Sequence, residues 1–156
     1  MSLINSLVER LGQDLGLGDL QFAERGLVEL LFEGDIAVTI EASAVGDALF
    51  LHTPLARAEE DSLAQGALFE SLLIANHVGN NPLGMILAID EGAGELVLSH
   101  RFAIDETAEF EDFVAALQQL ISRVLELRSV LTPSGESRVP ETLVGEARLC
   151  QPGLLA

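Results

Sequence analysis

Few residues in this sequence have both the type and the spacing to carry out chemistry. The three histidines, His52, His77 and His100, are too far apart to show the close ligand spacing of a zinc site. The single cysteine, Cys150, lies near the end of the chain, so no disulfide can form within it. All eight basic residues are arginines, which excludes phosphate-binding and Schiff-base lysines. The sequence therefore nominates no catalytic residue, no metal ligand and no cofactor.

The carboxylates are numerous, but helix starts and turns explain where most of them lie. Asp and Glu number 25 against 8 basic residues, and the formal net charge is −17. This charge opposes binding to nucleic acid or to anionic lipid, because both require a basic surface. The N-terminus lacks the basic region of a secretory signal, and no segment has the run of about 18 apolar residues that spans a bilayer. We expect a cytoplasmic protein that binds no nucleic acid and does not insert into membranes.

The sequence from residue 68 to residue 105 is the part around which the fold is expected to form. Its second half predicts a β-hairpin, with Met85–Asp90 and Glu95–Ile104 as strands on either side of a turn that contains two glycines. His100 falls on the apolar face of the second strand. A histidine in such a position is typical of a core or an interface and not of a metal site.

An apolar helix precedes this hairpin. It is expected to begin after Ala58 and to end near Val78, where glycine, asparagine and proline residues follow closely. Its apolar residues form three rows that cover well over half of its circumference, so it must be covered on more than one side. The cover is either a second subunit together with the chain's own sheet, or that sheet alone wrapped around the helix.

The N-terminal third predicts a helix followed by strands. Ser2 is a candidate N-cap, and Gly16 is the expected residue just past the end of the helix. Three strands with short glycine-containing connections predict an antiparallel meander over Leu20–Glu24, Leu27–Phe32 and Ile36–Ala42. If the first of these lies at a sheet edge, it offers backbone groups to a strand from another protein.

A weaker strand is predicted over Ala48–Leu55, where Pro54 suggests a peripheral end. The last element is a long amphipathic helix with Thr107 as its candidate N-cap and Arg128 near its C-terminal end. Its apolar stripe comprises Phe110, Phe113, Val114, Leu117, Leu120, Ile121, Val124, Leu127 and Leu131.

These elements predict one α+β domain over residues 1–131 and a flexible C-terminal tail over residues 132–156. The order is a helix, an antiparallel three-strand meander, a second helix, a β-hairpin and a C-terminal helix. The tail loses the periodicity of the preceding helix and contains several prolines.

Two segments resemble the class I type III secretion chaperones, the Tir-chaperone (CesT-like) family. They are LLIAN at Leu72–Asn76 with the turn that follows, and GELVLSHRFAIDETAEFEDFVAAL at Gly94–Leu117. The second segment is similar to that family's pattern of a glycine, an alternating strand, Arg-Phe-x-hydrophobic-Asp and a final helix. The resemblance covers residues 1–131 and does not extend to the tail.

The resemblance implies a homodimer assembled through the helix at Leu63–Val78. It also implies binding of an extended segment near the N-terminus of one or a few secreted effector proteins, with a further role in presentation to the secretion apparatus. No nucleotide is implied. By position, the candidate effector-binding residues are Leu7, Leu11, Leu20, Phe22, Leu30 and Phe32, and the candidate dimer-interface residues are Phe69, Leu73 and His77.

Two other functions are compatible with the same order of elements. A hot-dog-type dimeric enzyme acting on thioesters would wrap its sheet around the apolar helix and place a carboxylate beside a tunnel. A binding module without a role in secretion would use the same fold for another partner.

Overall fold

The computed structural model describes residues 2–23, 26–57, 62–77, 84–131 and 148–149. The helices are α1 (Leu3–Asp14), α2 (Ser62–Ala75) and α3 (Phe110–Leu131). The strands are β1 (Leu27–Phe32), β2 (Ile36–Ala42), β3 (Ala48–Arg57), β4 (Ile86–Asp90), β5 (Glu95–Ala103) and β6 (Arg148–Leu149). None of the described helices is both long and apolar enough to cross a lipid bilayer.

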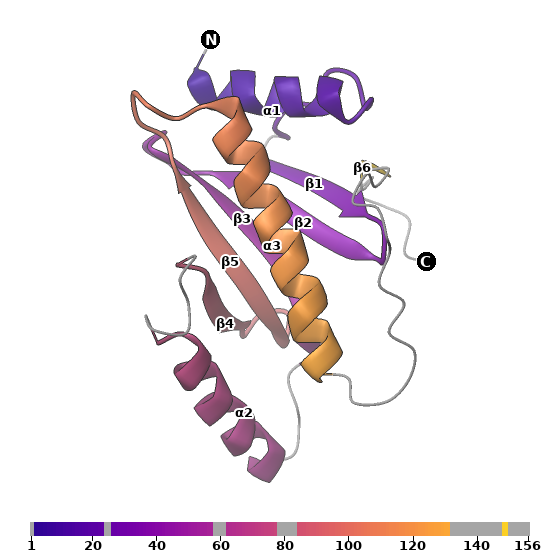
Figure 1. Ribbon diagram of the computed structural model, residues 1–156, viewed down its shortest axis with the longest axis vertical. Helices are drawn as coiled ribbons and strands as arrows, with labels where there is room; N and C mark the ends of the chain where they lie inside the picture. The colour runs from indigo at the N-terminus through magenta and orange to yellow at the C-terminus, as the bar shows by residue number, and fades with distance from the viewer. Residues whose placement is uncertain (1, 24–25, 58–61, 78–83, 132–147, 150–156) are drawn as a thin grey trace.

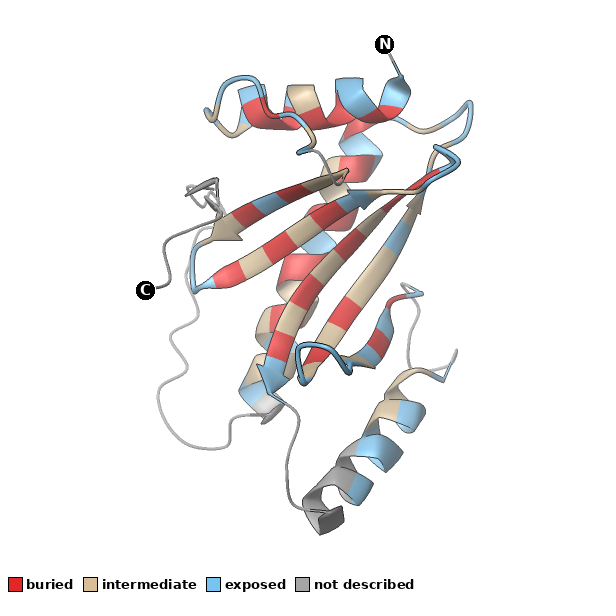
Figure 2. Cartoon of the chain, turned by 180° about the vertical axis from the view of Figure 1, so that it is seen from behind, coloured by how far each residue is buried: buried red, intermediate tan, exposed pale blue. Residues whose placement is uncertain are grey.

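The strands form one antiparallel sheet in the order β4-β5-β3-β2-β1-β6. Along β1, β2 and β3, buried residues alternate with more exposed ones (Figure 2), as expected for strands that cover a core with one face. The α+β class, the hairpin of β4 and β5, and the three helices agree with the sequence prediction.

The meander has the predicted three strands, but they lie further along the chain than predicted. Residues 20–23 form no strand, so the prediction for Leu20–Glu24 is wrong, and the weaker candidate, β3, is the third strand of the meander. The reason lies in the packing of this segment against α1, where Leu20 is 1% exposed. A Cβ atom on Gly12 would lie 2.5 Å from both Gly18 O and Leu20 Cβ, so only glycine permits this close approach.

The core lies between one face of the sheet and the helices α3 and α1. In Figure 1, α3 runs across this face of the sheet, and α1 lies across the end where α3 begins. Phe113, Leu120 and Val124 of α3 are fully buried. The Phe102 ring of β5 lies 5.5 Å from that of Phe113, in a tilted arrangement that is favourable for aromatic pairs.

Arginines connect α3 to the rest of the domain at both of its ends. At the first end, Arg10 of α1 pairs with Glu111 at 2.9 Å, and its guanidinium lies 4.1 Å from the centre of the Phe110 ring. At the other end, Arg128 donates hydrogen bonds to the carbonyl oxygens of Gly34 and Pro54. The orientation of α3 on the sheet is therefore held by polar contacts as well as by its apolar stripe.

The predicted helix ends are correct for α1 and wrong for the start of α3. The Ser2 hydroxyl accepts a hydrogen bond from the backbone N–H of Asn5, and Gly16 has φ of 69° just beyond the helix. The Thr107 hydroxyl instead donates to the Asp105 carboxylate at 2.7 Å, and α3 begins at Phe110. Glu111 and Asp112 still occupy the first turn, where the helix dipole favours negative charge.

Helix α2 lies beyond the β4 edge of the sheet and away from α1 and α3 (Figure 1). Its predicted ends at Ala58 and Val78 fall outside the described residues. The hot-dog alternative requires a sheet that wraps around α2, and the sheet of this fold does not do so. Most of the described α2 side chains are exposed (Figure 2), so the monomer leaves an apolar helix largely uncovered.

Candidate protein-binding surfaces

A hollow lies between α1 and the segment that follows it. Its volume is about 270 Å³, and its walls come from one side of α1 and from residues 20–22. Val8 and Leu20 form its buried base, while Gln21 is exposed and Phe22 is half-buried. The remaining lining residues are Asn5 and Glu9. The hollow thus joins an apolar base to polar walls, which suits an apolar side chain carried on a peptide backbone.

The structure places the predicted effector-binding residues in two groups. Leu7, Leu11, Leu20 and Leu30 are at most 3% exposed and belong to the hydrophobic core. The second group, Phe22 and Phe32, is half-buried and packs against that core. Leu20 and Phe22 are the two members that line the hollow.

The predicted dimer-interface residues share one exposed surface on α2. Phe69 is 41% exposed and Leu73 is 74% exposed, and His77 lies just past the helix end beside them. Ile74 adds a further side chain that is 56% exposed. These side chains line a shallow apolar surface with Gly66 and Glu70, which we call the α2 surface. Large apolar side chains gathered in this way are typical of a protein interface.

Asn76 joins α2 to the outer edge of β4. Its side-chain amide donates to the Leu87 carbonyl at 2.8 Å and accepts from the Leu87 N–H at 2.8 Å. The Asn76 amide therefore satisfies both outward backbone groups of Leu87, as a neighbouring strand would. This contact closes the β4 edge at the second residue of the strand.

The opposite edge of the sheet is β1, and the short strand β6 pairs with part of it. Leu149 lies opposite Leu30, and Arg148 lies opposite Leu31. The Ala23 N–H donates to the Leu27 carbonyl at 2.9 Å, at the start of the same edge. The edge of β1 is thus covered at each end by other parts of the chain.

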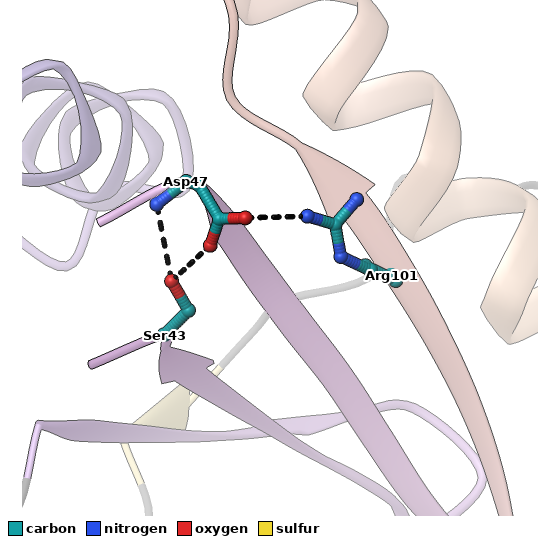
Figure 3. Close-up of polar contacts among 3 residues, drawn as sticks. All are labelled: Ser43, Asp47 and Arg101. Carbon is teal, nitrogen blue, oxygen red and sulfur yellow. Dashed lines mark hydrogen bonds and ion pairs between the residues drawn. The ribbon is translucent and has the colours of Figure 1, made fainter. Parts of the chain in front are cut away.

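Ser43, Asp47 and Arg101 form a polar cluster where the β2–β3 turn meets β5 (Figure 3). The Ser43 hydroxyl donates to the Asp47 carboxylate at 2.6 Å, and Arg101 donates to the same carboxylate at 2.8 Å. The hydrogen bond from Ser43, helped by the charge of Arg101, lowers the pKa of Asp47 from its ordinary value. The Ser43 contacts hold the turn itself, and the Arg101 contact joins it to β5, so the cluster is structural in character.

The histidines do not gather into a site. His52 Nδ1 lies 2.9 Å from the Ser99 hydroxyl, and its Nε2 lies 3.7 Å from the Glu41 carboxylate, on the sheet face opposite α3. His100 is half-buried on the core face, where burial lowers the pKa of its imidazole. The described residues contain no group of three or more side chains suited to holding a metal ion.

Sequence reasoning missed the roles of Asn76, Arg101 and β6. Asn76 and Arg101 lie inside the two segments that carry the family resemblance, so their positions were noted but not their contacts. Asn76 binds Leu87, 11 residues away in the sequence, and Arg101 binds Asp47, 54 residues away. Only the three-dimensional structure identifies such pairs.

The model of the Tir chaperone protein (CesT) family matches residues 6–128. No curated protein matches the sequence. Among solved structures, a chain of the ExsC–ExsE complex covers 86% of this chain and 100% of its own length, at 22% identity and a TM-score of 0.72. A chain of the HopA1–SchA chaperone–effector complex covers 83% of this chain and 98% of its own length, at 16% identity and a TM-score of 0.63.

A third structure is a heterodimer of ExoU and SpcU from the type III secretion system of Pseudomonas aeruginosa. The matching chain covers 84% of this chain and 96% of its own length, at 21% identity and a TM-score of 0.56. At these identities the likeness establishes a shared fold. The family match is a separate finding from this structural likeness, and it extends from within α1 to within α3.

Proposed function

The chain belongs to the Tir chaperone protein (CesT) family, and we propose that it is a dedicated type III secretion chaperone. It binds an extended segment near the N-terminus of one or a few effector proteins, keeps that segment soluble and unfolded, and aids its delivery to the secretion apparatus. The observation that carries this proposal is the family match over residues 6–128. The solved structures of similar fold are complexes, one of them described as a chaperone bound to an effector.

The hollow beside α1 supports a site for the effector. It combines a buried apolar base at Val8 and Leu20 with the half-buried Phe22, so an apolar side chain of the client gains contacts there. The edge of β1, the strand that ends at Phe32, is a template for strand addition. Side-chain anchors combined with strand addition would bind an extended segment without requiring that it be folded.

The α2 surface supports a homodimer. Leu73 alone leaves 74% of its surface exposed, together with Phe69 and Ile74. A second copy placed with its own α2 surface against this one would bury both sets, which is the self-complementary contact of a two-fold dimer. The dimer would then carry one effector-binding surface on each subunit.

We also infer that the protein works in the bacterial cytoplasm without catalysing a reaction. Its strong negative charge keeps a protein with exposed apolar surfaces from associating unspecifically. The proposed domain over residues 1–131 carries these surfaces. Residues 132–156 follow it in the sequence, and Arg148–Leu149 pairs with its β1 strand.

The experiment that tests this function is capture of a client by the tagged protein under secretion-inducing conditions. Phe22→Glu places a charge in the apolar hollow and should abolish capture while the dimer mass is unchanged. Val45→Glu also replaces an apolar side chain by a carboxylate, at a side chain that is 83% exposed in the β2–β3 turn, and it should have no effect. Gln21→Trp fills the hollow from an exposed position and should also weaken capture. If capture survives both changes in the hollow, the proposed site is wrong.

A further inference from the structure

The two edges of the sheet differ in what covers them. At β4, the Asn76 side chain satisfies the outward N–H and C=O of Leu87 at 2.8 Å each, so an added strand would have to remove a side chain of the same domain. At β1, the partner is the backbone of the short segment Arg148–Leu149, which is distant from β1 in the sequence. A backbone segment can be exchanged for another one without changing the hydrogen bonds made by β1.

The hydrogen bonds around β1 fix which of its residues face this edge. The Gly26 carbonyl accepts from Ala42 of β2, and the Leu27 carbonyl accepts from Ala23 on the other side. Because backbone groups alternate in direction along a strand, Leu27, Glu29 and Leu31 turn their N–H and C=O groups to the edge. Leu31 is the residue that lies opposite Arg148.

We propose that β6 (Arg148–Leu149) is an internal strand that closes the β1 edge until a client strand replaces it. This inference rests on the proposed function, since it names the occupant of the same edge when no client is bound. Within the residues that the structure describes, this segment pairs with Leu30 and Leu31. A longer client strand would pair with more of β1 and would therefore displace it.

Such a cover has two physical consequences. In the client-free protein it satisfies part of an edge that would otherwise pair with any extended chain, including another copy of this protein. It also lowers the apparent affinity for a client, because only the fraction of molecules with an open edge can bind. Selectivity then favours clients that pair along the whole strand.

Hydrogen exchange of the Leu31 amide in the full-length, client-free protein tests the closure. Arg148→Pro removes the N–H that faces Leu31, and the exchange protection of Leu31 should fall by about tenfold. Arg138→Pro is the matched control, because it removes the same charge and adds a proline in the same tail outside β6. Equal protection of Leu31 in the wild type, Arg148→Pro and Arg138→Pro proteins would overturn the proposal.

A second measurement is the affinity of a peptide for the open β1 edge. The probe is a labelled peptide of residues 144–152 in which Cys150 is replaced by serine. It should bind the Arg148→Pro protein about tenfold more tightly than the wild type, because the internal competitor is gone. A peptide with proline at position 148 should bind neither protein.

Equal affinity of the probe for both proteins would contradict the internal strand. Both measurements use the client-free protein, so they are independent of whether a client is captured. Failure of the proposed function would appear as an absent client together with an intact closure. Failure of this inference would appear as an open edge in a protein that still captures its client.

Discussion

Asn76 and Arg101 show what the residues of the family-like segments do in this fold. Asn76 binds the backbone of Leu87, and Arg101 binds the Asp47 carboxylate across the sheet end. Phe102, beside Arg101, packs against Phe113, and Asp105 accepts hydrogen bonds from Thr107. These contacts position the elements.

Replacing Asn76 tests this structural role. Asn76→Ala leaves the N–H and C=O of Leu87 without their amide partner, and we expect unfolding to become easier by about 1–3 kcal/mol. Gln118→Ala removes an exposed amide from α3 and should change stability by less than about 0.5 kcal/mol. Urea unfolding followed by circular dichroism measures both. Equal effects of the two changes would show that the Asn76 contact contributes nothing.

Asp47 makes the stability of the fold depend on pH in the acid range. Its pKa in the folded protein is lowered from 3.8 by the Ser43 hydrogen bond and the Arg101 charge. A lowered pKa means that the stabilisation is present above pH 4 and is lost as the pH falls through the folded-state value. We expect Asp47→Asn to be less stable than the wild type at pH 6 and to lose less stability between pH 5 and pH 3.

Urea midpoints across this pH range provide the measurement for Asp47. Asp19→Asn is a matched control in the α1–β1 connection, because it makes the same chemical change away from Ser43 and Arg101. If Asp47→Asn and the wild type show the same pH dependence, the carboxylate cluster does not contribute to acid stability.

At the scale of elements, apolar periodicity predicted the helices well and the strands less well. The apolar circumference of α2 indicated cover on more than one side, and Phe69, Leu73 and Ile74 are indeed exposed in the monomer. The same reasoning gave Ala48–Leu55 as a weaker strand and took Pro54 as a sign that its end is peripheral. The structure accommodates Pro54 at an irregularity in the register between β3 and β5, where proline does little harm.

The segment Leu20–Glu24 has the composition of a strand but packs against α1 instead. What decides its conformation is the close contact with Gly12, which depends on the position of α1 in three dimensions. The β6 strand was not predictable either, because two residues carry no periodic signal. Local pattern therefore predicted elements, while contacts between distant segments decided their ends and edges.

The α2 surface makes a direct prediction about assembly. Leu73→Asp places a charge where the dimer would bury an apolar side chain, so the protein should become monomeric or aggregate. Light scattering should give a mass of two chains of 16.6 kDa for the wild type. A soluble Leu73→Asp variant should have the mass of one chain. Val45→Asp, at an exposed side chain in the β2–β3 turn, should remain dimeric. An unchanged mass for Leu73→Asp would remove α2 from the interface.

At the scale of the whole molecule, the sequence predicted the class of function better than the site. The segments Leu72–Asn76 and Gly94–Leu117 resemble those of the type III secretion chaperones, and the family match confirms the chaperone family. The candidate residues were less predictable, because Leu7, Leu11 and Leu30 have the same apolar character as groove residues but lie in the core. Burial depends on the packing of α1 and α3, which composition alone does not reveal.

The most direct measurement of the central claim is native mass spectrometry of the tagged protein purified from its own bacterium and treated with protease. The account predicts a dimer carrying a protected fragment from the N-terminal region of a larger protein, which is digested when it is alone. A homodimer without any fragment under secretion-inducing conditions would contradict the account. A bound protein that is folded and protease-resistant by itself would instead favour a binding module without a role in secretion.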